Sequence, residues 1–129
     1  MIERKIQLTP VDVKRDEFGY WIHPEYQKYL IFNHPENEKL SQFDYEQMQN
    51  FLNVDFYDSD MCDELTDDQL DQYENDFDQS IVIHWNPKQP KAEAFLVSIF
   101  TCDDGVLARW AVQRPSVHTA LVQSIGEIA

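Results

Sequence analysis

Glycine and cysteine are scarce in this sequence, and long apolar runs are missing. The 129 residues include only three glycines, so the chain has no Gly-rich loop of the kind that binds phosphates. Cys62 and Cys102 lack C-x-x-C spacing, and we expect two free thiols, with a single disulfide as the alternative. No stretch reaches the roughly 18 apolar residues that cross a membrane, and the first residues lack the apolar segment of a signal peptide. We therefore expect a cytoplasmic protein without membrane association.

Basic residues are absent from the middle third of the chain. Residues 41–87 contain thirteen aspartates and glutamates and no lysine or arginine, whereas the segments on either side are close to neutral. The middle segment therefore carries nearly all of the net charge of −14. Such a charge argues against direct nucleic-acid binding, because phosphates attract basic surfaces, and against anionic membrane surfaces. It permits a basic protein as a partner and promotes solubility.

Motifs for catalysis and metal binding are also missing. Neither cysteine has a histidine nearby in sequence, no G-x-S-x-G motif occurs, and the four histidines are scattered. Asp58, Asp60 and Asp63 have the spacing of calcium ligands, but the sixth and twelfth positions of an EF-hand loop would be Asp63 and Gln69 instead of glycine and glutamate. We predict no catalytic residue, no metal and no cofactor. A small enzyme is the alternative, and it would need a pocket with converging polar groups.

The apolar content predicts a folded domain. Apolar residues make up 43% of the chain and aromatic residues 13%, which is enough for a core in a domain of this size. Helical patterns come early and a hairpin pattern comes late. We therefore expect a single acidic α+β domain over residues 1–129, with short helices in the first two thirds packed on an antiparallel sheet that ends in a C-terminal hairpin.

Three helices are expected in the first two thirds. Pro24 follows His23 as a typical first helical residue, and this helix should run to about Ile31. Ser41 begins a capping box before a helix over residues 42–53, whose buried face would consist of Phe43, Met48, Phe51 and Leu52. Thr66 caps a third, acidic helix, whose buried stripe would consist of Leu70, Tyr73 and Phe77.

Strands and turns fill most of the remainder. Residues 11–22 predict two short extended pieces around a turn at residues 16–19, and residues 58–64 predict a loop. The pair Asp104-Gly105 lies between two apolar runs, which is a strong hairpin signal. Residues 116–129 predict a short helix or a tail. The expected strands are residues 2–8, 54–57, 80–85, 94–100 and 106–112.

The acidic segment contains the candidate binding site. On the helix expected after Thr66, four acids recur at i, i+4, i+7 and i+11 and form one stripe. A second row of acids from residues 55–63 would bring the carboxylate spacing closer to that of the phosphates in duplex DNA, which lie roughly 3.4 Å apart along each strand. The predicted partner-binding residues are Asp55, Asp58, Asp60, Asp63, Asp67, Asp68, Asp71, Glu74 and Asp78.

Two stretches outside the acidic segment carry a resemblance. Residues 12–24 read D-V-K-R-D-E-F-G-Y-W-I-H-P, and a looser pattern of Trp85, Pro87 and Pro90 precedes the hairpin and Trp110. Together they resemble a group of small bacterial proteins from prophages and other mobile elements. The group has no known activity, so no catalytic residue follows from the likeness. The resemblance implies an accessory protein of a phage or mobile element.

These observations lead to one functional hypothesis and its rivals. We expect a non-enzymatic accessory protein whose acidic face binds a basic protein, such as a nucleic-acid-binding protein, in the manner of a DNA mimic that counters restriction or CRISPR defence. The first alternative is an immunity or antitoxin-like protein that neutralises a basic toxin. The second is a domain whose acidity serves only solubility.

Overall fold

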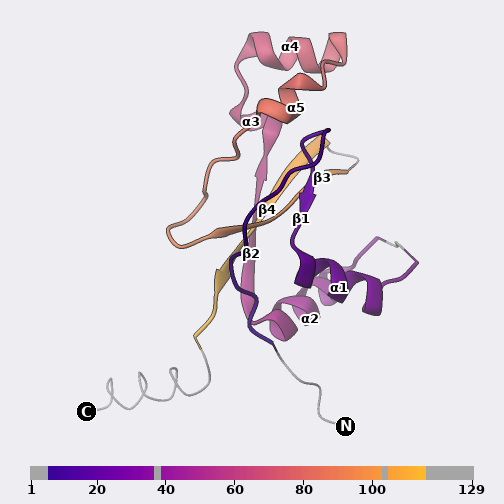
Figure 1. Cartoon of the computed structure of the whole chain (residues 1–129), viewed down its shortest axis with the longest axis vertical. Helices are drawn as coiled ribbons and strands as arrows, with labels where there is room; N and C mark the ends of the chain where they lie inside the picture. The colour runs from indigo at the N-terminus through magenta and orange to yellow at the C-terminus, as the bar shows by residue number, and fades with distance from the viewer. Residues whose placement is uncertain (1–5, 37–38, 103–104, 116–129) are drawn as a thin grey trace.

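The computed structural model describes residues 6–36, 39–102 and 105–115 (Figure 1). Over these residues it contains five helices and one four-stranded antiparallel sheet, so the predicted α+β class with a C-terminal hairpin is confirmed. Across the sheet the strands lie in the order β1 (Trp21–Ile22), β3 (Phe95–Cys102), β4 (Gly105–Gln113) and β2 (Val54–Asp60). The helices are α1 (Pro24–Asn33), α2 (Gln42–Leu52), α3 (Met61–Glu64), α4 (Asp67–Asp76) and α5 (Ser80–His84).

The helices form two groups at opposite ends of the long axis (Figure 1). Helices α1 and α2 pack at one end of the sheet, and α3, α4 and α5 lie at the other end. Successive residues of a strand point to opposite faces, so β4 supplies two separate cores. Ala111 packs with residues of α1 and α2, whereas Val106 and Ala108 pack with Val82 and Trp85 at the α5 end.

Local capping explains the two helices that were predicted best. At the start of α1, the His23 ring accepts a hydrogen bond from the Glu25 backbone, and Pro24 occupies the first turn. At the start of α2, the hydroxyl of Ser41 accepts from the backbone of Asp44, whose carboxylate accepts from the Ser41 backbone in return. Helix α2 ends where Asn53 adopts a left-handed conformation with a φ of 55°.

Several predicted core positions are instead exposed. The capping box at Thr66 forms as expected, but α4 contains no buried residue. Phe77 lies after the helix with 85% of its surface exposed, and Leu70 and Tyr73 are only half-buried. This stripe fails because α4 lies beyond the sheet and packs mainly on the short α5 (Figure 1). Phe43 is likewise 65% exposed rather than part of the core.

The predicted strand over residues 80–85 is wrong, because Ser80–His84 form α5. The carboxylate of Asp78 accepts hydrogen bonds from the backbone and the hydroxyl of Ser80, which favours a helical start. Val82 is fully buried on the helix. These contacts override the strand preference of the Ile-Val-Ile run.

The loop predicted for residues 58–64 is also wrong. Strand β2 continues to Asp60 because residues 58–60 pair with residues 107–109 of β4. The carboxylate of Asp60 then accepts from the Cys62 backbone and starts the short helix α3.

The remaining predictions can be compared with the structure only in part, because some of the residues concerned lie outside the described ranges. Of the strand predicted at residues 2–8, only residues 6–8 are described, and they are not part of the sheet. The backbones of Ile6 and Leu8 instead donate to the carbonyls of Phe51 and Leu52. Residues 103–104 and 116–129 lie outside the described residues. Cys62 and Cys102 are free thiols, and no helix among the described residues has the length and apolar character to cross a bilayer.

Candidate functional site

Residues of the motif at 12–24 form a turn and pack against other parts of the fold. The carboxylate of Asp16 accepts hydrogen bonds from the backbones of Phe18 and Tyr20 and forms the turn between the two extended pieces. Gly19, with a φ of +91°, lies so close to α5 that a Cβ there would meet the Ile83 Cα at 3.0 Å. Asp16 is therefore explained by local folding and Gly19 by packing on α5.

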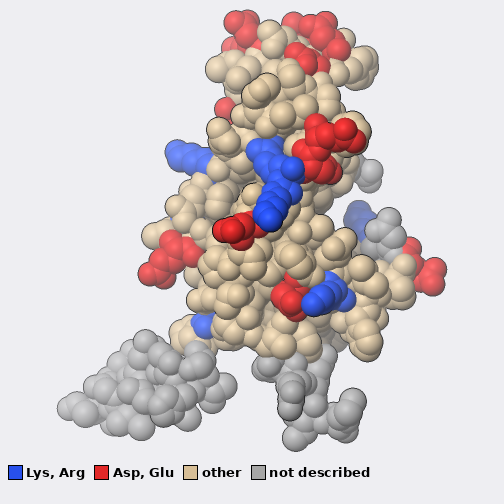
Figure 2. All heavy atoms as spheres, viewed as in Figure 1, with Lys and Arg blue, Asp and Glu red and all other residues tan. Residues whose placement is uncertain are grey.

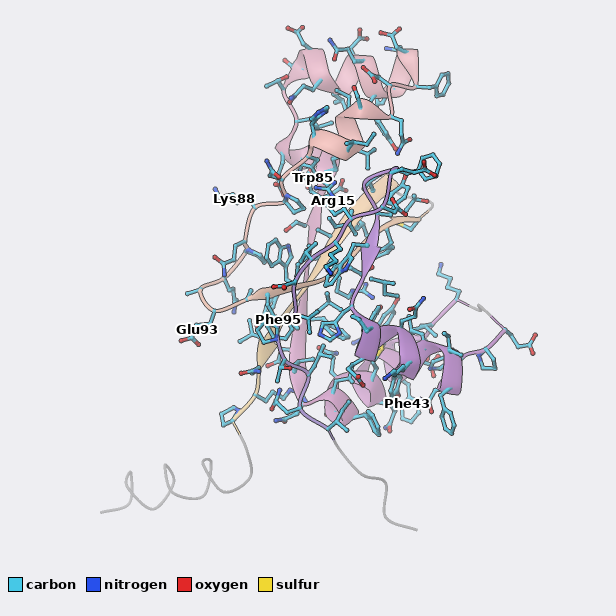
Figure 3. The ribbon with its side chains drawn as sticks, in the orientation of Figure 1. Arg15, Phe43, Trp85, Lys88, Glu93 and Phe95 are labelled. Carbon is cyan, nitrogen blue, oxygen red and sulfur yellow. The ribbon has the colours of Figure 1, made fainter. Side chains whose placement is uncertain are left out.

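Arg15 and His23 fix this segment to two other parts of the chain. The guanidinium of Arg15 donates to the carbonyls of Gly19, Val82 and Trp85, and Figure 3 shows Arg15 beside Trp85. His23 is almost fully buried, and its Nε2 lies 2.7 Å from the carbonyl oxygen of Thr9. Arg15, Asp16 and His23 of the motif thus have structural partners.

The structure divides the predicted acidic site into acids that have structural partners and acids that do not. Asp55 and Asp58 are three residues apart on β2 and therefore point to opposite faces of the sheet. Asp55 accepts from Arg114 at 2.8 Å, and Asp58 accepts two hydrogen bonds from Arg109 at 2.9 and 3.0 Å. These two carboxylates are neutralised and do not form one row.

Asp60 and Asp78 serve mainly as local caps. Asp60 caps α3 through the Cys62 backbone. Hydrogen bonds from the Ser80 hydroxyl and backbone hold the pKa of Asp78 below its usual value. Asp78 also follows the left-handed residue Phe77, so it lies outside the helical stripe in which the sequence pattern placed it.

The remaining predicted acids are exposed at the α4 end of the molecule. Asp63 lies on α3, and the others lie on α4 together with Asp76. Figure 2 shows acidic side chains gathered at this end. No ion pair among the described residues involves the carboxylates of α4. We call the α4 residues Asp67, Asp68, Asp71, Glu74 and Asp76 the α4 surface.

The dipole of helix α4 favours some of the negative charges of the α4 surface and disfavours others. Asp67 and Asp68 lie in the first turn, where the helix dipole stabilises negative charge. Glu74 and Asp76 lie near the opposite end, where the dipole disfavours negative charge, and the last turn contains no basic residue. The acids at the C-terminal end of α4 therefore lower the stability of the helix that carries them.

An apolar feature adjoins the α4 surface. Phe77 is exposed, and a hollow of about 290 Å³ lies between Tyr73, Glu74, Phe77 and Gln79. An exposed aromatic ring beside charged groups is a common arrangement at protein interfaces, where the ring supplies much of the binding energy. The sequence pattern had placed Phe77 in the core, so this feature was missed.

A second group of polar residues surrounds Arg109, which was not predicted as functional. Arg109 is 8% exposed, and besides Asp58 its guanidinium donates to the Tyr26 hydroxyl at 3.0 Å. The rings of Tyr45 and Phe100 flank it, with centroids 4.8 and 5.2 Å from the guanidinium carbon. One signal was available in the sequence, since Arg109 is the single charged residue in the apolar run 106–112.

A cavity of about 320 Å³ opens beside this arginine, between the sheet and the first two helices. Burial raises the pKa of Tyr26, although the nearby positive charge of Arg109 opposes this shift. The hydroxyl of Ser98 donates to the Trp21 carbonyl. The cavity is lined by Ile22, Tyr26, Leu30, His34, Leu40, Tyr45, Ser98, Phe100, Thr101 and Arg109.

A search for metal ligands and comparisons with known proteins assign no further function to these residues. Within the described residues, no group of three or more histidine, cysteine, aspartate or glutamate side chains is placed to hold a metal ion. No family model matches the chain, and no curated protein and no solved structure shows significant similarity to it.

Proposed function

We propose that this protein is a non-enzymatic accessory protein of a phage or mobile element and that it binds a basic protein partner through the α4 surface. The observation that carries this proposal is a helix whose exposed carboxylates have no ion-pair partner among the described residues and which contributes no buried residue to either core. Such a helix presents its charge to a partner without placing a carboxylate in either core. The link to a mobile element rests on the motif at residues 12–24.

Two features favour a binding surface over acidity that serves only solubility. Glu74 and Asp76 oppose the helix dipole, so their charge lowers the stability of α4. Phe77, next to them, is exposed, and an exposed phenylalanine lowers solubility rather than raising it. A basic partner with an apolar contact would compensate for both, because it would neutralise the acids and cover the ring.

The geometry also narrows the kind of partner. Because Asp55 and Asp58 are neutralised by arginines, they leave a single helical row of free acids. One row is sparser than the phosphates of a duplex and lies on one side of the molecule. It therefore fits a basic helix, loop or groove wall better than it imitates both strands of DNA.

The test is affinity capture from bacterial lysate with two matched variants. The first changes Asp67, Asp68 and Asp71 to Asn and Glu74 to Gln. The second removes four exposed charges elsewhere, with Asp12→Asn and with Glu17, Glu36 and Glu93 changed to Gln. We expect the native chain and the second variant to capture the same basic protein, and the first variant to lose it. Loss of that protein at high salt would support an electrostatic contact.

The variant Phe77→Ala tests whether capture of the partner depends on a specific contact or only on the total charge of the surface. It leaves every carboxylate in place, so weakened capture by this variant would locate the contact at the C-terminal end of α4. Equal capture by both charge variants would overturn the proposal. A captured nuclease or other toxin would favour the immunity alternative, and a captured DNA-binding regulator would favour anti-defence activity.

A further inference from the structure

Two tyrosine hydroxyls beside Arg109 are available as hydrogen-bond donors to the cavity. The hydroxyl oxygen of Tyr26 accepts from Arg109, so its own proton must point to a different acceptor. Within the ranges that the structure describes, neither Tyr26 nor Tyr45 has a hydrogen bond in which its hydroxyl is the donor. Both residues line the 320 Å³ cavity, and Tyr26 is 95% buried. These two hydroxyls can therefore donate to an acceptor that enters the cavity.

The charge balance at Arg109 indicates what kind of acceptor would fit beside the two tyrosines. Asp58 accepts two hydrogen bonds from Arg109, so the charge of the guanidinium is already compensated. An anionic ligand would therefore add an uncompensated negative charge to a protein whose net charge is −14. A neutral oxygen such as a carbonyl meets the tyrosine donors without this penalty.

The rest of the lining indicates the body of the ligand. Ile22, Leu30, Leu40 and Phe100 supply apolar surface around the donors. The volume of about 320 Å³ is at the lower end of the range for ligand pockets. Apolar walls with a few converging donors are the usual composition of a small-molecule site.

We propose that this cavity binds a small, uncharged, largely apolar molecule whose carbonyl oxygen accepts hydrogen bonds from the hydroxyls of Tyr26 and Tyr45. The buried Arg109 orients the Tyr26 hydroxyl and in turn is held by Asp58. The site is separate from the α4 surface and does not depend on the function proposed for it.

The test is a titration of the isotope-labelled full chain, followed by backbone amide chemical shifts. The probes are acetophenone, which is an apolar ring with a carbonyl, and benzoate, which has a similar size and a negative charge. We expect saturable shifts at Tyr26, Ser98 and Phe100 with acetophenone at millimolar concentrations, as is usual for such small ligands. At neutral pH, the affinity for benzoate should be at least about tenfold lower than the affinity for acetophenone.

Three variants that remove single hydroxyl groups complete the test. Tyr26→Phe and Tyr45→Phe keep the rings, and each should weaken acetophenone binding about five- to tenfold. Tyr57→Phe is the matched control, because Tyr57 lies on the other face of β2 beneath Lys91. This variant should bind acetophenone with the same affinity as the native chain. Absence of saturable shifts at these residues, unchanged affinity in both variants, or tighter binding of benzoate would each overturn the proposal. Tyr45 is half-buried, so its variant serves as the test if Tyr26→Phe does not fold.

Discussion

The guanidinium of Arg15 donates a hydrogen bond to the carbonyl oxygen of Val82 at 2.6 Å, across 67 positions of the sequence. Val82 belongs to α5, a helix of only five residues whose last carbonyls have few partners within the helix. Arg15 also donates to the Trp85 carbonyl just beyond its end. A side chain from the start of the protein thus completes the hydrogen bonding of a helix near residue 80.

Replacing Arg15 with methionine should therefore lower the stability of the whole domain. The variant keeps an apolar stem but removes the Arg15 donor from the carbonyls of Gly19, Val82 and Trp85. Val82 keeps only its bond from the Trp85 backbone, and the loss should cost about 2 kcal/mol. Urea denaturation followed by tryptophan fluorescence measures the free energy of unfolding. Lys14→Met removes the same charge from an exposed neighbouring side chain and should change stability by less than about 0.5 kcal/mol. Equal losses in both variants would refute the role given to Arg15.

Two glycines with positive φ allow backbone strain to be separated from close packing. Gly19 and Gly105 have φ values of +91° and +116°, so alanine is strained at both positions. An added Cβ would meet the Ile83 backbone at 3.0 Å in the first case, but only the Cys62 sulfur at 4.0 Å in the second. Thermal unfolding should show that Gly19→Ala costs about 1 kcal/mol more than Gly105→Ala. A larger loss in Gly105→Ala would contradict the close approach to α5.

The two arginine–aspartate pairs of β2 should differ in strength because they differ in burial. The Arg109 side chain is 10% exposed and that of Arg114 is 30% exposed. Asp58→Asn leaves a buried guanidinium without its carboxylate and should cost about 2 kcal/mol. Asp55→Asn weakens a surface pair and should cost less than about 1 kcal/mol. Chemical denaturation of the two variants tests this order, and equal costs would argue against the buried role of Arg109.

The capping box of α2 should make stability depend on pH in the acid range. Hydrogen bonds from the Ser41 backbone and side chain hold the pKa of Asp44 below its ordinary value of 3.8. The carboxylate therefore stabilises the fold above that value, and this contribution is lost as the pH falls through the lowered pKa of the folded state. Asp44→Asn should be less stable than the native chain at neutral pH and should approach it in strong acid.

Denaturation curves at a series of pH values check this expectation. Glu46→Gln removes a charge from the same helix without touching the cap, so it serves as the control. A difference between native and Asp44→Asn proteins that does not narrow on acidification would show that the cap contributes little.

The elements predicted correctly are those specified by contacts close in sequence. Ser41 and Asp44 are three residues apart and form their capping box without help from the rest of the chain. The Asp104-Gly105 pair likewise marks the hairpin, because glycine accepts the positive φ there. Such elements can be predicted from a single sequence, because the residues that interact lie in the same short segment as the structure they form.

The elements that were missed depend on contacts distant in sequence. Ser80–His84 contains a β-favouring Ile-Val-Ile run, and its helix is completed by Arg15. Phe77 has apolar spacing, but its burial depends on whether the sheet extends beneath α4, and it does not. The Arg109 cavity brings together Tyr26, Tyr45 and β4, and only the folded chain makes them neighbours.

Helix α4 supplies no fully buried residue, although its half-buried Tyr73 packs against the core at the α5 end. The sequence of its exposed side is therefore nearly independent of how the rest of the chain folds. Substitutions on its outer side leave both cores and the sheet intact, so few of them would be removed by selection for stability. The exposed residues of α4 can therefore change with a partner while the elements that carry them stay the same. Such an arrangement would let recognition of a partner evolve faster than the fold.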